Sequence, residues 1–520
     1  MDRAAACIVV AWGGSCFAQP VASMAQWSTL GGGAARSGGL ATTTDGWWPA
    51  RWVCSGTAQG TPIEWVGQAG VAATAIGPGR VFAVGLVNFE TFAFGVDAET
   101  GEIVWQTALP DLIFDSWSSP TLDPTTGTVL FAAGEEFIAL REVDGSVAWA
   151  TELDGPAVNV TPVVTDDLGL RNRAFVTDYG GFGGPSRLYC VNVSPFHPRA
   201  NPHQPGDIVW SVPIGSSMGG TPAYMDGVVY VCGTGLDTDG RGEIYAFDAT
   251  VDAAPAPTWI FDNPITEGFF GGLTVREMNQ RTFVYAASYS FYGGTDSANM
   301  VKVDASDGSL VWSIACNRTD SIPVVLDDCR IALAGGVMGF GSVPMVELFQ
   351  DHGGSVTRLW DTAHGTWNDA NQNSQLDLGE FLVVGGWTTQ PAAIGSGGAT
   401  RLLVGAIPTD DQYFGPCTAL YELDLSKAPG DPGFVLRSSS IAGSTPGLLG
   451  RGVYSVGTDG LAALGAAPPR PDMDQDGDLD IDDLYRWHGS PTDVDRTGVV
   501  NAADGAFIER EIRRNERRVH

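Results

Sequence analysis

The densest group of possible metal ligands is residues 472–483, which read DMDQDGDLDIDD. Seven of these twelve residues carry carboxylates, which would repel one another strongly unless a cation neutralised them. Alternate oxygen-bearing residues, glycine at position six and an acid at position twelve match the spacing of a calcium loop. We therefore predict a Ca²⁺ site formed by Asp472, Asp474, Asp476, Asp478 through its carbonyl, Asp480 and Asp483. A solvated acidic linker is the alternative, but it explains neither Gly477 nor the apolar Leu479.

Two further stretches follow this spacing with fewer charges. Residues 493–504, DVDRTGVVNAAD, would supply Asp493, Asp495, Thr497, the Val499 carbonyl, Asn501 and Asp504. Residues 369–380, DANQNSQLDLGE, would supply Asp369, Asn371, Asn373, Gln375, Asp377 and Glu380. We predict a weaker calcium site in the former. In the latter we predict a site that pins an insertion after Trp360, although Ser374 replaces the usual glycine and a polar Asn/Gln loop is the alternative.

Motifs for catalysis are weaker. Residues 215–219, GSSMG, match G-x-S-x-G, but a nucleophile elbow requires a strand–turn–helix context. Here the motif leads into a strand that begins at Thr221-Pro222, so we interpret it as a connection between strands. His197 and His203 lie in a Pro-broken loop without zinc-ligand spacing. The sequence therefore indicates no catalytic and no cofactor-binding residue.

Charge and targeting signals limit the partners and the compartment. With 28 Lys and Arg against 60 Asp and Glu, the formal net charge is −32, which argues against nucleic acid as a partner. Residues 1–18, with Arg3 before an apolar run and small residues at Cys16 and Ala18, are expected to be a secretory signal. A misassigned start or a buried strand is the alternative. No later run reaches the ~18 apolar residues of a membrane span, so we expect a monomer that is secreted, extracellular or in the cell envelope.

Six cysteines would remain after removal of the signal: Cys54, Cys190, Cys232, Cys316, Cys329 and Cys417. An even number in an exported protein permits disulfides, and Cys316 with Cys329 is the best local pair. Buried free thiols are an equal alternative.

A repeated β unit must position these groups. Residues 92–107, FAFGVDAETGEIVWQT, read as a strand, a turn with Gly101 at positive φ, and a second strand that contains Trp105. Such short strands recur every 40 to 61 residues, at Trp65, Trp105, Trp149, Trp210, Trp259, Trp312 and Trp360. An eighth, Phe434-Val435-Leu436, lacks tryptophan, and eight apolar strands, several beginning with Thr-Pro or Ser-Pro, alternate with them. This spacing suits four-stranded blades, so we predict an all-β, eight-bladed propeller.

The ends of the repeat indicate how the ring closes. The first tryptophan strand, residues 61–67, precedes any innermost strand, and no tryptophan strand follows the last innermost strand. We therefore expect this N-terminal strand to be the outermost strand of the last blade, which removes exposed sheet edges. The propeller would span residues 26–465, followed by a Pro-rich linker at 466–471 and the acidic module at 472–520. A β-sandwich array or a β-helix is the alternative architecture.

The repeats AETGEIVW, VDGSVAW and ASDGSLVW resemble the docking signature of eight-bladed propellers of the pyrroloquinoline-quinone (PQQ-like) type. Residues 27–38, WSTLGGGAARSG, are similar to the segment that precedes the first blade in many of them. The resemblance implies that each tryptophan packs between neighbouring blades. It argues against bound PQQ, because the adjacent-cysteine pair usual in quinoprotein dehydrogenases is missing from the sequence. Their catalytic Asp and calcium ligands match no segment either.

The two C-terminal loops resemble a dockerin, a small α-helical module with EF-hand-like calcium loops, here with Asp at position twelve. The loops begin 21 residues apart, which is shorter than usual, so the first helix, residues 481–488, is brief. The recognition positions are Ile481-Asp482 and Ala502-Ala503, unlike the familiar Ser-Thr type. The resemblance therefore implies calcium binding more firmly than cohesin binding. The basic end of the chain, EREIRRNERR, is a solvated tail or a surface for an acidic partner.

Together these features predict a secreted, non-enzymatic binding or scaffold protein. Its propeller would present loops to an unknown protein, cohesin-like or on a cell surface, or to a polysaccharide, and the calcium module would attach it. One alternative is a quinoprotein-type dehydrogenase with a divergent site. Another is an envelope-assembly scaffold that resembles the propeller lipoprotein of outer-membrane assembly; the missing lipobox and the added calcium module count against it.

Overall fold

The computed structural model describes residues 27–519 apart from 41–47, 68, 75–78, 115, 124, 182, 292, 396–399, 410–414, 466–472, 474–479 and 495–499. The signal sequence expected at residues 1–18 and the linker expected at 466–471 therefore lie outside the described residues. Most of the remaining chain forms short antiparallel strands.

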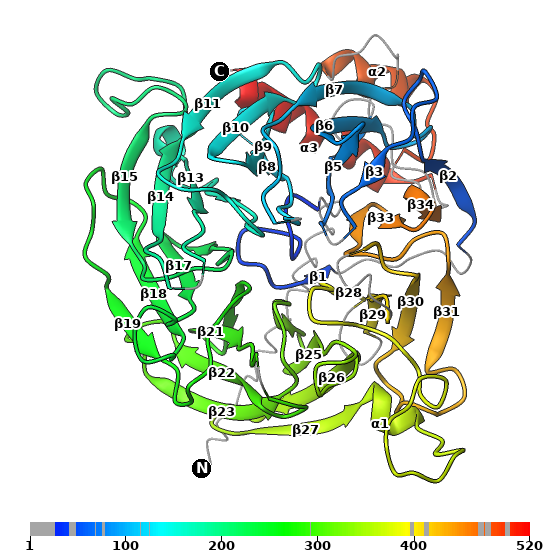
Figure 1. The fold of residues 1–520 in the computed structure, drawn as a ribbon. Helices are drawn as coiled ribbons and strands as arrows, with labels where there is room; N and C mark the ends of the chain where they lie inside the picture. Colours follow the sequence, from blue (N-terminus) through cyan, green and yellow to red (C-terminus); the bar gives the residue numbers. More distant parts are fainter. Residues whose placement is uncertain are drawn as a thin grey trace, which may run out of the picture.

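Eight sheets surround a central axis and form a closed ring (Figure 1). From the axis outward, blade 1 consists of β4 (Ala72–Thr74), β5 (Arg80–Val87), β6 (Glu90–Asp97) and β7 (Ile103–Ala108). Blade 2 consists of β8 (Thr121–Asp123), β9 (Thr128–Ala133), β10 (Glu136–Arg141) and β11 (Val147–Glu152). Blade 3 consists of β12 (Val163–Val164), β13 (Arg173–Thr177), β14 (Arg187–Asn192) and β15 (Ile208–Pro213). Blade 4 consists of β16 (Ala223–Met225), β17 (Val228–Gly233), β18 (Glu243–Asp248) and β19 (Trp259–Asp262).

The second half of the ring repeats this order. Blade 5 consists of β20 (Leu273–Met278), β21 (Arg281–Ala287), β22 (Ala298–Asp304) and β23 (Leu310–Cys316). Blade 6 consists of β24 (Val324–Val325), β25 (Arg330–Gly335), β26 (Met345–Asp351) and β27 (Val356–Asp361). Blade 7 consists of β28 (Ala392–Ile394), β29 (Arg401–Ala406), β30 (Ala419–Asp424) and β31 (Val435–Ser439). Blade 8 consists of β32 (Gly447–Leu449), β33 (Gly452–Gly457), β34 (Gly460–Gly465) and β2 (Ala50–Cys54). The predicted eight-bladed propeller is confirmed.

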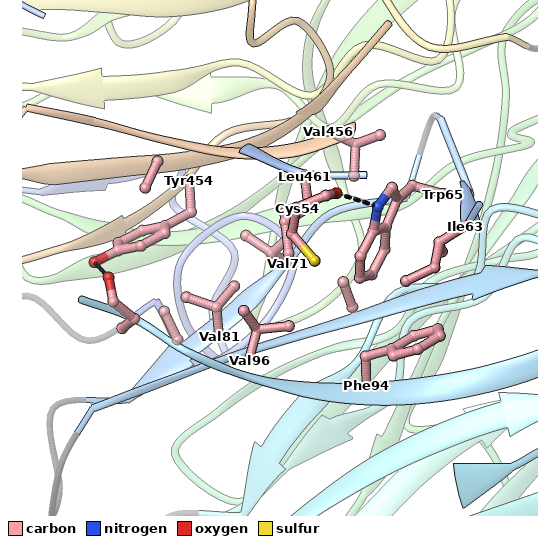
Figure 2. Packing of buried hydrophobic residues seen from close by; sticks show 14 of the residues in the cluster. Cys54, Ile63, Trp65, Val71, Val81, Phe94, Val96, Tyr454, Val456 and Leu461 are labelled. Atoms are coloured by element: carbon pink, nitrogen blue, oxygen red, sulfur yellow. Dashed lines mark hydrogen bonds between the residues drawn. The ribbon is translucent and has the colours of Figure 1, made fainter. Parts of the chain in front are cut away.

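The ring closes through a strand from the N-terminal part of the chain. β2 is the outermost strand of blade 8 and pairs antiparallel with β34, so the predicted mode of closure is confirmed. The predicted strand, residues 61–67, is wrong. Trp65 lies instead in β3 (Glu64–Trp65), which pairs with β5 of blade 1, and its indole N–H donates to the Cys54 carbonyl at 2.7 Å (Figure 2). Both segments place a tryptophan in a short strand, so the local pattern did not distinguish them.

Tryptophans of the outermost strands dock onto the following blade. The indole N–H of Trp105 donates to the Glu142 carbonyl of blade 2 at 3.0 Å. A Cβ added to Gly145, in the turn that faces this ring, would lie 2.5 Å from it, so glycine permits the close approach. Indole N–H groups also donate into the following blade from Trp52, Trp210, Trp259 and Trp312. The packing implied by the resemblance is thus observed, and Trp52 in β2 is the docking residue that the pattern missed.

Buried apolar side chains fill the space between neighbouring blades. Between blades 8 and 1, Val81 and Phe94 pack in one cluster with Tyr454 and Leu461 (Figure 2). Because each sheet is covered on both faces, strands such as β9 and β33 are buried along their whole length. This two-sided burial explains why the strands read as apolar runs rather than as alternating patterns.

Residues 27–40, here called the axial segment, run through the middle of the ring, where Figure 1 shows them in dark blue. The segment's carbonyls accept hydrogen bonds from innermost-strand amides of five blades, those of Ala73, Leu122, Tyr224, Val275 and Ala393. Its last residues form β1 (Gly39–Leu40), which pairs in parallel with β28. The segment therefore ties blades on opposite sides of the ring to one another.

Arg36 is fully buried within the axial segment. Its guanidinium donates to one hydroxyl and four carbonyls, those of Thr29, Leu30, Thr161, Pro162 and Pro222, at 2.6–3.3 Å. Burial lowers the pKa of Arg36 to about 9, so the side chain remains charged at neutral pH. Because these carbonyls belong to the segment and to the inner ends of blades 3 and 4, one side chain joins three parts of the ring.

Helices are confined to connections and to the C-terminal region of the described chain. α1 (Thr362–Thr366) follows blade 6, and α2 (Ile481–Gly489) and α3 (Ala502–Val519) follow blade 8. The last two helices share a small core that includes Trp487, Phe507 and Ile508. Within the described residues, no helix is both long and apolar enough to cross a bilayer.

The six described cysteines are free thiols. Of the two alternatives left open by the sequence, free thiols are observed, and Cys316 and Cys329 are not bridged. Cys316 is buried in the core shared by blades 5 and 6, and burial raises its pKa well above the ordinary value. Cys329 lies in the turn between β24 and β25, only partly buried.

The axial segment yields a test of stability. Arg36→Leu should lower the free energy of unfolding by about 3 kcal/mol or more, because it leaves several buried carbonyls without a donor. Urea denaturation followed by tryptophan fluorescence measures the change. Arg141→Leu is the matched control, since the Arg141 side chain is exposed, and it should cost at most ~0.5 kcal/mol. Equal denaturation midpoints for the two variants would contradict the role given to Arg36.

Candidate functional site

The first predicted calcium loop leads into α2, and the structure describes its ligands Asp480 and Asp483. Asp472, Asp474, Asp476 and Asp478 lie outside the described residues. Asp483 is buried, and its carboxylate accepts the backbone N–H groups of Met473 at 2.5 Å and Asp480 at 2.9 Å. The Asp480 side chain accepts the N–H of Asp482 at 2.8 Å and caps the helix. The acid at position twelve thus joins the two ends of the loop.

The second loop repeats this arrangement at the start of α3. Asp504 is buried and accepts the backbone N–H groups of Val494 and Asn501, each at 2.8 Å. The Asn501 side chain accepts the N–H of Ala503 at 2.8 Å, as Asp480 does in the first loop. Asp493 is also described, whereas Asp495, Thr497 and Val499 are not. Positions two, nine and twelve therefore make equivalent hydrogen bonds in both loops.

Each acid at position twelve lies in the first turn of a helix, where unpaired backbone N–H groups favour a negative charge. In calcium loops of this spacing, the acid at position twelve completes the ligand shell. In both loops, the described residues therefore hold the acid at position twelve at the start of the following helix by the same hydrogen bonds.

The third predicted site, residues 369–380, closes on itself after α1. The Asp377 carboxylate accepts the side-chain N–H groups of Asn371 at 2.7 Å and Asn373 at 2.6 Å. These hydrogen bonds, Asn371 first, lower the pKa of Asp377 and keep it ionised. Predicted ligands at positions three, five and nine are therefore in direct contact; the Asn371 and Asn373 side chains are exposed, and Asp377 is half-buried.

The ends of the same loop are joined by its outer acids. Asp369 accepts the backbone N–H groups of Asn373 and Ser374 at 3.0 Å, and Glu380 accepts that of Asn371 at 3.1 Å. The predicted Gln375 donates its backbone N–H to Asn373 at 2.8 Å. Ser374 has a φ of +59°, which a glycine would adopt at less cost. The weakness seen in the sequence thus corresponds to backbone strain at position six.

Acids alone do not make this loop a metal centre. Across the described residues, no three His, Cys, Asp or Glu side chains come together as a metal-binding group. A cation at residues 369–380 would therefore also need oxygens of the Asn371 and Asn373 amides and of the backbone. Such mixed carboxylate and carbonyl ligation suits Ca²⁺ better than zinc or iron.

Sequence reasoning missed a small cavity of about 20 Å³ on the propeller axis. It is lined by Leu30 of the axial segment and by residues near the innermost strands, among them Trp117, Ser119, Thr221, Asp320, Gln390 and Thr445. Four of these residues precede or belong to the Pro-containing marks used to count blades, so their positions were visible in the sequence. Their convergence at one point depends on the closed ring.

This cavity does not fit a quinone cofactor of the PQQ type. Pockets for molecules of that size enclose roughly 300–1,000 Å³. The axial cavity, at about 20 Å³, holds about one water-sized group, and Leu30 closes one wall of it. The residues present therefore leave no room for a tricyclic ring system on the axis.

The G-x-S-x-G motif connects β15 to β16, and no helix follows it. Ser217 is buried, and its hydroxyl oxygen accepts the backbone N–H groups of Gly219 at 3.2 Å and Gly220 at 2.9 Å. The interpretation as a connection between strands is confirmed.

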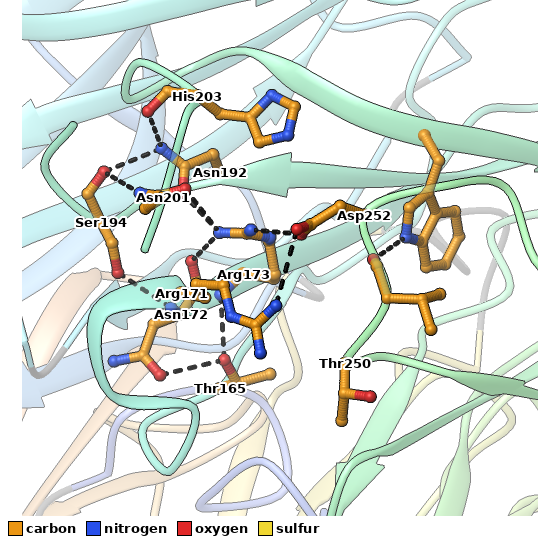
Figure 3. A network of polar contacts seen from close by, with 12 residues as sticks. Thr165, Arg171, Asn172, Arg173, Asn192, Ser194, Asn201, His203, Thr250 and Asp252 are labelled. Carbon is orange, nitrogen blue, oxygen red and sulfur yellow. Dashed lines mark hydrogen bonds and ion pairs between the residues drawn. The ribbon is translucent and has the colours of Figure 1, made fainter. Parts of the chain in front are cut away.

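His197 and His203 lie in the insertion between β14 and β15. A buried polar network holds this insertion (Figure 3). Arg173 donates to the Asn192 side chain at 2.5 Å and to Asp252 at 3.0 Å, and Asn192 donates to the His203 carbonyl at 3.0 Å. The network contacts His203 through its backbone, so its evident role is to fix the loop.

Known proteins share the repeat and the fold. A PQQ-like repeat model, described as outer membrane protein assembly factor BamB, matches residues 93–181. No curated protein matches the chain. BamB from Moraxella catarrhalis is similar with a TM-score of 0.48 at 15% identity, over 77% of this chain and 95% of that one.

Two solved dehydrogenase structures are also similar. A europium-containing methanol dehydrogenase has a TM-score of 0.54 at 10% identity, over 94% of this chain and 95% of that one. The quinohemoprotein alcohol dehydrogenase ADHIIG from Pseudomonas putida HK5 has a TM-score of 0.53 at 8% identity, over 83% of this chain and 75% of that one. At such identities the likeness shows the fold alone: this chain is an eight-bladed β-propeller with PQQ-like repeats.

Proposed function

We propose that this protein is a secreted, non-enzymatic binding scaffold with a rigid propeller and a calcium-dependent, dockerin-like attachment module. The observation that carries the proposal is the filled axis. The axial segment bonds to the innermost strands of five blades and leaves a cavity of about 20 Å³. A substrate or quinone has no room there. Partners would therefore bind to the loops at the two ends of the propeller.

Calcium is the cation that the acidic loops suit best. Asp483 and Asp504 are buried, fixed by matching hydrogen bonds and placed at helix starts. Asp and Asn oxygens at alternate loop positions are ligands that Ca²⁺ accepts in flexible geometry. Residues 369–380 would form a further site that stabilises the insertion after blade 6.

The partner is a protein, cohesin-like or on a cell surface, or a polysaccharide. A net charge of −32 disfavours nucleic acid and favours partners with a basic or neutral surface. The expected signal at residues 1–18 supports a location outside the cell or in its envelope.

Two other functions have specific support. The fold shared with alcohol and methanol dehydrogenases, together with Asp320 and Trp117 on the axis, favours a quinoprotein-type dehydrogenase whose cavity would have to enlarge. The repeat match at residues 93–181 to an outer-membrane assembly factor favours an envelope-assembly scaffold. We rank both below the binding scaffold because neither explains the acidic loops.

Calcium should stabilise the C-terminal module of the full-length protein through Asp476. Ca²⁺ at 100 times its Kd would contribute about 2.7 kcal/mol, so the module's thermal transition should rise when calcium replaces chelator. Asp476→Asn, which removes a predicted ligand charge, should lose most of this rise in calorimetry. Asp482→Asn is the matched control, because Asp482 is exposed and occupies position eleven, and it should respond like the wild type. Identical responses of the two variants would contradict the assignment.

Calcium should also protect residues 369–380 from proteolysis. Asp377→Asn removes the charge that Asn371 and Asn373 surround, so it should reduce the protection by about tenfold, equal to about 1.4 kcal/mol. The cleavage rate in this loop, with calcium and with chelator, measures the effect. Asp307→Asn, at an exposed turn of blade 5, should leave the protection unchanged. Protection that survives in Asp377→Asn would argue against a site in this loop.

The scaffold and dehydrogenase readings differ in a direct assay. Full-length protein incubated with PQQ and Ca²⁺ should not oxidise alcohols or sugars in a dye-linked assay, because the axis has no room for the quinone. Capture from the native secretome should recover a partner with calcium and release it with chelator. Turnover in the assay would reverse the ranking, and capture of no partner in either condition would contradict the binding function.

A further inference from the structure

The Asp320 carboxylate differs from the other polar groups that line the axial cavity, because one of its oxygens lacks a hydrogen bond within the described chain. Asp320 lines the cavity just before the innermost strand of blade 6, and its Oδ1 atom is buried without a hydrogen-bond partner among the described residues. Its backbone N–H is bonded to the Trp387 carbonyl at 2.7 Å, so the main chain at this position is fixed. A buried, unbonded carboxylate oxygen is costly unless a ligand or a proton satisfies it.

The other polar side chains of the cavity already have protein partners. Ser119 accepts the Gly70 N–H, Thr221 accepts the Thr161 N–H, Gln390 bonds to both backbone groups of Ile322, Ser321 donates to the Thr389 carbonyl, and Asn159 accepts the Trp117 N–H. These bonds are 2.6–3.2 Å long. Asp320 therefore stands out within this lining as the group with an unmet bonding requirement.

Within the described part of the chain, no cationic side chain is paired with this carboxylate. Arg318, two residues away, donates instead to the Phe291 carbonyl at 3.2 Å and the Phe340 carbonyl at 2.5 Å, and lies over the Tyr289 ring at 5.7 Å. Burial alone raises the pKa of Asp320 to about 8. Near neutral pH the carboxylate therefore changes readily between a protonated form and an anion that requires a cation.

Aromatic rings form part of the cavity wall. Trp117 and Phe270 line the cavity with Asp320. Behind them, Trp387 packs against Trp117 at 5.7 Å and against Tyr289 at 5.3 Å, and Tyr289 packs against Phe270 at 5.2 Å. Aromatic faces attract organic cations, and the attraction increases in a site shielded from water.

We propose that the axial cavity binds a primary ammonium group, which pairs with the Asp320 carboxylate and lies against the Trp117 and Phe270 rings. A volume of about 20 Å³ matches one water-sized head group, so the ammonium enters and its carbon substituent remains towards the loops. A free small amine and a lysine side chain of another protein share this chemistry. This site is separate from the acidic loops and goes beyond the proposed attachment function.

Other ligands suit the cavity less well. Ca²⁺ and Mg²⁺ need six or more oxygen ligands, and the lining provides one carboxylate among side chains already engaged. An anion would meet the negative charge of Asp320 and of a chain with net charge −32. A water molecule would satisfy the hydrogen bond but would leave the charge unbalanced.

Isothermal titration of full-length protein at pH 9 tests the site with methylammonium and with Nα-acetyl-lysinamide as probes. Both amines are charged at this pH because alkylammonium groups titrate near ~10.4. Asp320→Asn, which keeps the shape and removes the charge, should weaken binding at least tenfold and should not lower the stability of the free protein. Asp111→Asn, at an exposed aspartate before blade 2, is the matched control and should bind like the wild type. Trp117→Leu should weaken binding severalfold.

Binding should weaken as pH falls below about 8, because protons and ammonium compete for the same carboxylate. The other titratable groups near it are Arg318, Tyr289, whose pKa burial raises to about 12, and Glu267, whose pKa burial also raises. Methylammonium binding by itself would indicate a free amine as ligand, and tighter binding of the lysine probe a protein side chain. No binding of either probe, equal binding by Asp320→Asn, or equally tight binding of Na⁺ or K⁺ would overturn the proposal.

Discussion

The hydrogen bonds of the buried Arg36 guanidinium fix the axial segment at the centre of the ring. A propeller of eight blades leaves a gap at its centre, because its innermost strands are short; β12 and β24 each have two residues. Carbonyls at the ends of such strands need donors. The axial segment supplies acceptors to innermost-strand amides of five blades, and Arg36 supplies donors to the carbonyls before blades 3 and 4. The filled axis in turn accounts for the small volume, about 20 Å³, of the cavity that the described residues leave there.

Much of the fold could be predicted because its signals are local. Tryptophan strands and Pro-containing innermost strands each recur once per blade, so two independent counts gave eight. Closure was predicted in kind but assigned to the wrong strand, because Trp52 and Trp65 lie 13 residues apart in similar short strands. Only pairing with β34, a contact across the whole propeller sequence, distinguishes them. The state of the cysteines stayed open, because an even number of cysteines permits bridges without placing the thiols together.

The candidate sites divide in the same way. The acidic loops were proposed as calcium sites from spacing within twelve residues, and this stays a prediction; the structure adds hydrogen bonds around Asp377, Asp483 and Asp504. Asp320 could not be found, because nothing next to it in sequence indicates chemistry. Its importance arises when Trp117, 203 residues earlier, comes to the same point on the axis. Sites built within one loop are visible in a sequence, whereas sites built by ring closure require the structure.

Hydrogen exchange of the innermost strands tests the central claim, that the axial segment stays in the middle of the ring. The amides of Ala73, Leu122, Tyr224, Val275 and Ala393 donate to this segment. The account predicts that they exchange as slowly as the central sheet amides of the same blades, through global unfolding alone. Fast exchange of these amides while the sheets remain protected would show that the segment leaves the axis, and would contradict the account.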